Sequence, residues 1–272
     1  MTGITNPLEL YKHLEKTNCG ACGVPSCMAF AVAVVQGRKR LRDCPRMDAD
    51  LLAQFDDRIE TRKTLSDDRE EALARLKKQL AGIDFAAAAR RLDARLVNGR
   101  LAVRCLSKDF QLDHHGHLVS ECHTNTWVLM PLLHYVIHCR GDEPRGAWVP
   151  FKELPGAEDW GRFFAHRCTE PLRQLVDAHM ELVLTILHVF GAEPAAEPTS
   201  ADQALIIHPL PKVPFLINYW QPEDGFDSKL NILFDRSAAA NSSPESIYLL
   251  GRGLVEMFRQ LIVSHSRDGK LF

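Results

Sequence analysis

Four cysteines close to the N-terminus have a spacing that could hold a metal centre. Cys19, Cys22, Cys27 and Cys44 stand in the pattern C-x2-C-x4-C-x16-C. The first two intervals place three thiolates in one tight loop, and the third is long enough for a helix to leave the loop and return. Because four thiolates are the usual complement of a 4Fe-4S cluster, the pattern predicts one such cluster with these four cysteines as its ligands.

Zinc is the alternative metal, since four cysteines also make a closed tetrahedral structural site. Zinc sites usually present their cysteines as two pairs, whereas this chain offers one pair, Cys19 and Cys22, and two single residues, Cys27 and Cys44. The spacing therefore favours the cluster over zinc. The other four cysteines are scattered, and because free cysteine is often buried as a small hydrophobe, we expect a packing role for Cys105, Cys122, Cys139 and Cys168.

Residues around the four cysteines suit a negatively charged cluster. Gly20 and Gly23 have no side chain to shield their backbone N–H groups, so we expect these groups to approach the sulfur atoms and tune the cluster potential. Cys27 is expected in the first turn of a helix, whose positive dipole end would stabilise the cluster. Four basic residues stand just before the last cysteine: Arg38, Lys39, Arg40 and Arg42. They would offset the cluster charge or form a docking patch for an acidic redox partner. The alternative is an ordinary solvated surface.

Two short helices, over residues 7–17 and 25–36, are expected to position the cysteines. Asn6 can cap the first helix, and Gly37 is a usual stop for the second. The segment between the helices is rich in glycine and proline, which describes a tight loop. The sequence therefore predicts a compact cluster-binding module over residues 1–47.

Residues 8–45 resemble the small 4Fe-4S module of the corrinoid iron-sulfur protein large subunit and of the B subunit of the Rnf electron-transport complex. The likeness covers the cysteine spacing, Pro25, and the dipeptides Cys19-Gly20, Cys22-Gly23 and Cys44-Pro45. The resemblance implies that the four cysteines are cluster ligands. It also suggests, by association alone, a redox partner that contains a corrinoid or another low-potential centre.

The remaining chain predicts a larger α+β domain. Residues 48–84 are dense in both charges and carry one apolar helical face, so they predict a charged helical linker. Residues 85–272 mix strands and helices, with two strands over residues 95–113 around Asn98-Gly99 and a largely helical stretch over residues 159–189. This order predicts an α+β fold, in which a small helical 4Fe-4S module precedes a domain with a mainly antiparallel sheet.

The second part of the chain, from about Phe85, resembles an uncharacterised domain that accompanies this module in many short proteins of anaerobic bacteria and archaea. The likeness is carried by the segments LLHYV, WVPFKEL, PKVP and NILFD, at residues 132–136, 148–154, 211–214 and 231–235. This resemblance implies a family without implying a function.

Composition limits the classes of partner and activity. The net charge of -2 over 272 residues gives no field for holding nucleic acid, and no segment approaches the ~20 apolar residues of a membrane span. The N-terminus does not read as a secretory signal, so we expect a cytoplasmic protein whose thiols stay reduced. There is no P-loop, nucleotide-binding glycine loop or nucleophile elbow, so ordinary kinases and hydrolases have no support.

Histidines supply the other candidate metal ligands. His134 and His138 stand four residues apart in an expected apolar helix, so they share a face and could hold a metal; packing is the alternative. A second group of possible metal ligands consists of His114, His115 and His117, with Cys122 and His123 nearby. It falls in an expected turn, so a solvated polar loop is the alternative to a metal site. The sequence leaves the role of all five open.

Three functions are compatible with these features. The leading hypothesis is an electron-transfer or redox-accessory protein, in which the cluster passes one electron to a partner. The second is a redox enzyme whose C-terminal domain binds a cofactor or substrate that the cluster reduces. The third is a sensor, in which cluster loss or oxidation changes how the module docks on the domain.

Overall fold

The structure is a computed structural model that describes residues 6–48, 52, 65–120, 126–196, 199–223 and 225–268. The chain divides into two compact units, Met1–Ala74 and Arg75–Phe272. Cys122, His123 and most of the predicted linker between residues 48 and 65 lie outside the described residues. The described part of that linker is the helix α4 (Leu65–Leu80).

The first unit begins its two helices at side-chain caps. The Asn6 side chain accepts from the Leu8 N–H at 2.9 Å, and the Ser26 hydroxyl accepts from the Ala29 N–H at 3.1 Å. Each cap satisfies a backbone donor that a helix start leaves unpaired. The described elements of this unit outside α4 are α1 (Pro7–Lys12), α2 (Cys27–Val35) and the 3-10 helix η1 (Leu41–Asp43).

The first helix is shorter than predicted. It ends at Lys12 instead of continuing to about Thr17. Lys16 and Asn18 have φ values of 58° and 48°, and such left-handed residues cannot continue a right-handed helix. The residues after α1 therefore form an irregular segment that leads into the cysteine loop.

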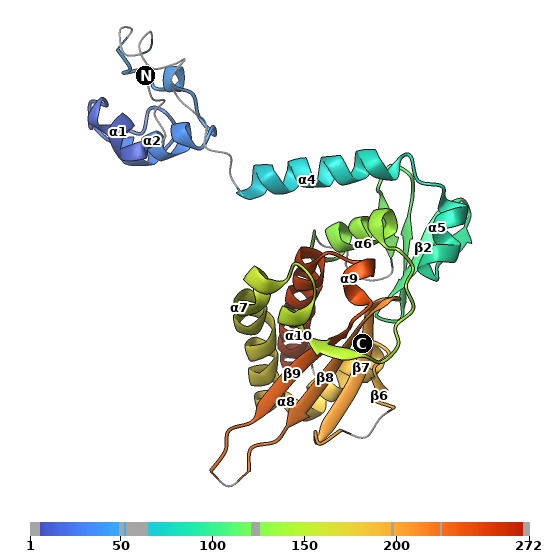
Figure 1. The fold of residues 1–272 in the computed structure, drawn as a ribbon. Helices are drawn as coiled ribbons and strands as arrows, with labels where there is room; N and C mark the ends of the chain where they lie inside the picture. The colour runs from blue at the N-terminus through green and yellow to red at the C-terminus, as the bar shows by residue number, and fades with distance from the viewer. Residues whose placement is uncertain are drawn as a thin grey trace. The chain divides into compact units, whose positions relative to one another are not determined.

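The second unit contains two antiparallel sheets (Figure 1). The strand order is β1-β2-β3-β4 in one sheet and β5-β9-β8-β7-β6 in the other. The first sheet consists of β1 (Arg95–Val97), β2 (Arg100–Cys105), β3 (Lys108–Leu112) and β4 (Leu118–Ser120). The second consists of β5 (Trp148–Pro150), β6 (Glu193–Pro194), β7 (Gln203–Leu210), β8 (Val213–Trp220) and β9 (Lys229–Asp235).

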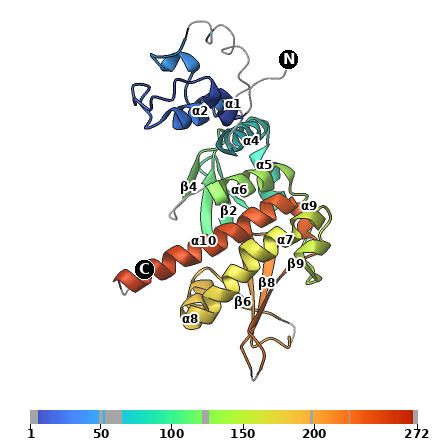
Figure 2. The ribbon, with the colours of Figure 1, turned by 90° about the vertical axis from the view of Figure 1, so that its left-hand side faces the viewer.

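Helices cover one face of the second sheet, where α8 and α10 run side by side (Figure 2). The Phe164 ring lies 5.3 Å from that of Phe234, which lies 4.7 Å from that of Phe215, so helix and sheet share an aromatic core. A Cβ on Gly251 would lie 2.9 Å from the Phe164 ring, so glycine permits this close approach. The helices described in the second unit include α5 (Phe85–Leu92), α6 (Thr126–His138), α7 (Gly161–Phe164), α8 (Glu170–Val189), α9 (Ala238–Asn241) and α10 (Pro244–Asp268).

A buried asparagine joins three segments of the second unit. Asn241 is 0% exposed. Its side-chain oxygen accepts from the N–H groups of Gly141 and Asp142 at 3.1 and 3.0 Å, and its side-chain nitrogen donates to the carbonyl oxygens of Asp142 and Lys212 at 2.7 and 3.0 Å. Since buried polar groups need such partners, Asn241 fixes the loop after α6 to the core.

The predicted fold class is confirmed: a small helical part precedes a larger α+β region with antiparallel sheets. The stretch predicted as two strands contains three, because the chain reverses again at Leu106 and Ser107, whose φ values are 49° and 62°. The predicted helical stretch over residues 159–189 includes the π-helix Ala165–Thr169 and a kink at His179. Among the described residues, no helix is long and apolar enough to cross a membrane.

We predict that a fragment covering Arg75–Phe272 folds without iron, because its core and its buried hydrogen bonds come from its own residues. Thermal unfolding followed by circular dichroism should give one cooperative transition that a chelator does not change, with a free energy of unfolding of about 5–15 kcal/mol. A fragment with no cooperative transition, or with one that disappears on iron removal, would contradict the division into two units.

Candidate metal centre

The loop that carries the first three cysteines takes its shape from residues with positive φ. Asn18, Gly20 and Gly23 have φ values of 48°, 71° and 78°, a region that asparagine and glycine enter at the least cost. The Gly23 N–H donates to the Gly20 carbonyl at 2.9 Å and closes a turn. The Gly23 N–H is thus used to turn the chain, and the approach of the Gly20 and Gly23 N–H groups to sulfur stays a prediction.

The four predicted ligands line one cavity of about 160 Å³. Cys44 joins the loop cysteines because α2 carries the chain away and η1 precedes its return. In the described ranges, no group of three or more His, Cys, Asp or Glu side chains is placed to hold one metal ion. The thiols thus surround a space instead of meeting at a point. The rest of the wall includes His13, Leu14, Thr17, Phe30, Arg46 and Met47.

The four thiols differ in their access to solvent. Cys19 is exposed, whereas the other three thiols are half-buried and pack against the apolar core of the first unit. That core joins α1, α2 and η1, and consists of Leu10, Leu14, Phe30, Ala31, Val34, Val35 and Leu41. The apolar packing therefore holds one side of the cavity and leaves an edge open at Cys19.

Neighbouring groups donate hydrogen bonds to sulfur atoms of the candidate ligands, among them those of Cys27 and Cys19. The Asn18 N–H donates to Cys27 Sγ at 3.4 Å. The backbone N–H of Ala21 and then the hydroxyl of Thr17 lower the pKa of the exposed Cys19 thiol. Sequence reasoning missed these donors, although asparagine directly before a cysteine loop is a signal for a left-handed turn residue.

Cys44 shows how close the thiols are to one another. Burial raises the pKa of Cys44, the backbone N–H of Arg46 opposes that rise, and the charges of the other three thiols add to it. Like charges that share a site disfavour one another's ionised form. A bound cationic centre would remove this repulsion, because metal ligation requires thiolates.

The donor set fits an iron-sulfur cofactor. Four soft sulfur donors, which suit such clusters, line a common cavity. Backbone N–H groups reach sulfur atoms, and hydrogen bonds of this kind orient and tune cluster ligands. The residues that could hold the cluster are therefore those that the spacing predicted: Cys19, Cys22, Cys27 and Cys44.

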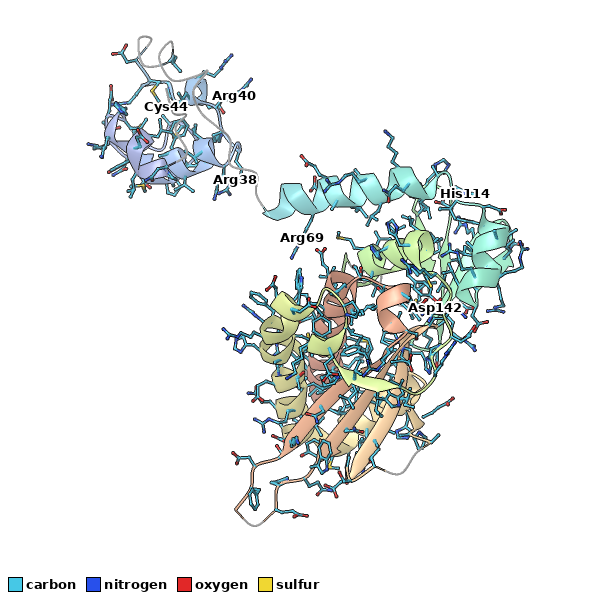
Figure 3. The ribbon with its side chains drawn as sticks, in the orientation of Figure 1. Arg38, Arg40, Cys44, Arg69, His114 and Asp142 are labelled. Carbon is cyan, nitrogen blue, oxygen red and sulfur yellow. The ribbon has the colours of Figure 1, made fainter. Side chains whose placement is uncertain are left out.

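The predicted basic segment lies at the surface of the first unit, where Arg38 and Arg40 are exposed (Figure 3). The Arg40 side chain is 72% exposed and lies 3.9 Å from the Asp43 carboxylate. Lys39 is half-buried, and its ammonium group lies 3.6 Å from where a Cβ on Gly23 would stand. The segment thus places positive charge beside the cysteine loop.

The described stretch of residues 6–48 carries a net positive charge, unlike the chain as a whole. Residues 6–48 contain seven Lys and Arg against four Asp and Glu, whereas the whole chain has 33 against 35. Arg46, which sequence reasoning did not single out, lines the cavity and lies 3.7 Å from Glu15. Glu15 and Asp48 also line the cavity, so Arg46 does not give its wall a net positive charge.

The histidines near residue 115 are held in a turn. The Asp113 carboxylate accepts from the N–H groups of His115 and His117 at 2.9 Å, and lies 3.0 Å from His117 Nδ1. Burial would raise the pKa of Asp113, but these hydrogen bonds lower it to about 2. His114 stacks on Phe85 with ring centroids 3.8 Å apart. These contacts tie the turn to Asp113 and place His114 against Phe85.

His134 and His138 lie together on α6, with ring centroids 4.6 Å apart. His134 Nδ1 is buried without a hydrogen-bond partner. Burial and then the neighbouring His138 lower the pKa of His134 to about 4. His134 is thus neutral at ordinary pH.

Two family models match the chain. One, described as a domain of unknown function (DUF3786), matches residues 84–257. The other describes an Fe-S cluster and matches residues 14–46, which include all four cysteines. The chain therefore combines an N-terminal iron-sulfur module with a second, uncharacterised domain.

Curated relatives match a short stretch of the chain. Acetyl-CoA decarbonylase/synthase complex subunit gamma 2 of Methanosarcina mazei is 52% identical over 42 residues, which is 15% of this chain and 9% of the relative. The corrinoid/iron-sulfur protein large subunit of Moorella thermoacetica is 53% identical over 38 residues, 14% of this chain and 8% of the relative. The chain thus spans less than a tenth of either relative. No solved structure matches it.

We predict that replacing any one of the four candidate ligands by serine lowers the iron content of the protein. One cluster contributes about four irons per chain, and an anaerobically purified Cys22→Ser protein should contain far fewer. Cys105→Ala and Cys168→Ala are matched controls, because both cysteines are buried in the second unit. Equal iron loss from Cys105→Ala and Cys22→Ala in metal analysis would show that the ligand assignment is wrong.

Proposed function

We propose that this chain, which belongs to the DUF3786 family of domains of unknown function, is an electron-transfer or redox-accessory protein. In this proposal Cys19, Cys22, Cys27 and Cys44 hold one 4Fe-4S cluster. The observation that carries the proposal is the arrangement of the four thiols around one cavity with a single exposed edge at Cys19.

The two sides of the cavity have different tasks in electron transfer. The half-buried thiols of Cys22, Cys27 and Cys44 rest on an apolar core, which keeps water from that side of the centre. The exposed edge at Cys19 gives a partner protein access. A 4Fe-4S cluster held there would supply a one-electron carrier, and the electron would come from a low-potential protein donor and leave to a protein acceptor.

The partner is proposed to be a redox protein with an acidic docking surface. Arg38 and Arg40 are exposed beside the cysteine loop, and complementary charge speeds the encounter of two proteins. Two relatives that match a short stretch of the chain are subunits named for an acetyl-CoA decarbonylase/synthase complex and a corrinoid/iron-sulfur protein. A corrinoid or similar low-potential centre is therefore the proposed acceptor, in the reducing cytoplasm.

We predict that protein purified without oxygen is brown and contains about four iron and four acid-labile sulfide per chain. Dithionite should reduce it by one electron and produce an electron paramagnetic resonance signal of a reduced cubane. Stoichiometric zinc without sulfide would overturn the proposed function, and so would two irons per chain.

We predict that an acidic electron carrier reduces the cluster more slowly as ionic strength rises, because salt screens the attraction between opposite charges. Arg38→Glu should lower the second-order rate constant at low salt by up to about tenfold. Arg104→Glu, an exposed residue of β2 in the second unit, changes the net charge by the same amount and should leave the rate unchanged. Stopped-flow absorbance measures both, and equal effects would exclude docking at the basic segment.

A further inference from the structure

Asn18 links the two ends of the cysteine loop through a pair of hydrogen bonds. Its backbone N–H donates to Cys27 Sγ at 3.4 Å. Its side-chain oxygen accepts from the Cys27 N–H at 2.8 Å. The residue directly before Cys19 thus holds both the sulfur and the backbone of Cys27, nine positions along the chain.

The side-chain bond meets a need of the helix that follows. Cys27 is the first residue of α2, and the first N–H groups of a helix have no partner inside it. Ser26 accepts from the Ala29 N–H, which leaves the Cys27 N–H to be satisfied from outside. The Asn18 side chain supplies that acceptor, so the start of α2 is tied to the residue before Cys19.

The backbone of Asn18 is suited to this role. Its φ of 48° lies in the left-handed region, which asparagine tolerates better than most residues with a side chain. In this conformation the main-chain N–H and the side-chain oxygen both reach Cys27. A residue that avoids left-handed φ would turn one or both groups away.

We propose that Asn18 is a positioning residue for the cluster: its side chain fixes the backbone of Cys27 and so places the thiolate, and its main-chain N–H group sets the potential of the centre through its bond to the sulfur. This inference rests on the proposed ligand set. A hydrogen bond to a ligand sulfur stabilises the reduced cluster, which carries one more negative charge, more than the oxidised cluster. Loosening this bond shifts the reduction potential to more negative values.

The test compares two asparagines of the same module in the full chain. Asn18→Gly keeps the left-handed conformation accessible and removes the side-chain oxygen. Asn6→Gly is the control: it removes the side-chain oxygen that caps α1 and accepts from the Leu8 N–H, a bond that involves no sulfur. Asn18→Asp retains an acceptor oxygen. The measurements are iron per chain, the rate of iron loss to a chelator, the midpoint potential and the electron paramagnetic resonance g values of the reduced protein.

The expected result is a negative shift of the potential and altered g values in Asn18→Gly, with faster iron loss, while Asn6→Gly keeps the wild-type potential and g values. Should Asn18→Gly lose its iron entirely, the inference requires Asn18→Asp to retain iron. Wild-type potential and g values in iron-loaded Asn18→Gly would overturn the inference, and so would equal iron loss from Asn18→Gly and Asn18→Asp. Full iron content in Cys27→Ser would instead refute the proposed ligand set.

Discussion

Four thiols that repel one another when ionised must be held around one small space, and the first unit is organised by that requirement. Three of them come from a loop of nine residues, and the fourth arrives after α2 and η1. The module of residues 1–47 has little apolar surface to bury, and domains of about 40 residues usually need a metal or a disulfide to fold. Binding of the proposed cluster would therefore contribute to the folding free energy of residues 1–47, whereas the second unit has a core of its own.

The constraint also explains which side of the unit is apolar. The core residues of α1, α2 and η1 lie behind Cys22, Cys27 and Cys44, so they support these thiols and restrict water there. Cys19 stands at the open edge, where the Ala21 N–H and the Thr17 hydroxyl favour its ionised form by lowering its pKa. Solvent access and hydrogen bonding to sulfur are both determinants of cluster potential, and the loop sets them residue by residue.

The cysteine spacing was enough to predict one loop, one helix and four converging thiols, because ligand spacing limits the paths a short chain can take. It did not predict which N–H groups face sulfur, since that depends on φ values at Lys16 and Asn18 that no side-chain pattern determines. The same limit applies in the second unit. The residue types of Asn98-Gly99 were enough to predict a turn there. The chain also reverses at Leu106 and Ser107, which have left-handed φ values that such residues rarely adopt, so tertiary contacts must impose this second turn.

The second unit contains cysteines that could compete for iron, and its packing prevents this. Burial raises the pKa of Cys168 to about 12 and that of Cys105 further, so both remain protonated at neutral pH. Since only the thiolate binds metal, and since both residues are closed off from solvent, neither can capture iron. Cys139 is also buried, with a raised pKa and its thiol directed to Asn241. The chain thus separates its thiols by environment: those that face a shared cavity are available as ligands, and those described in the second unit are kept as neutral core residues.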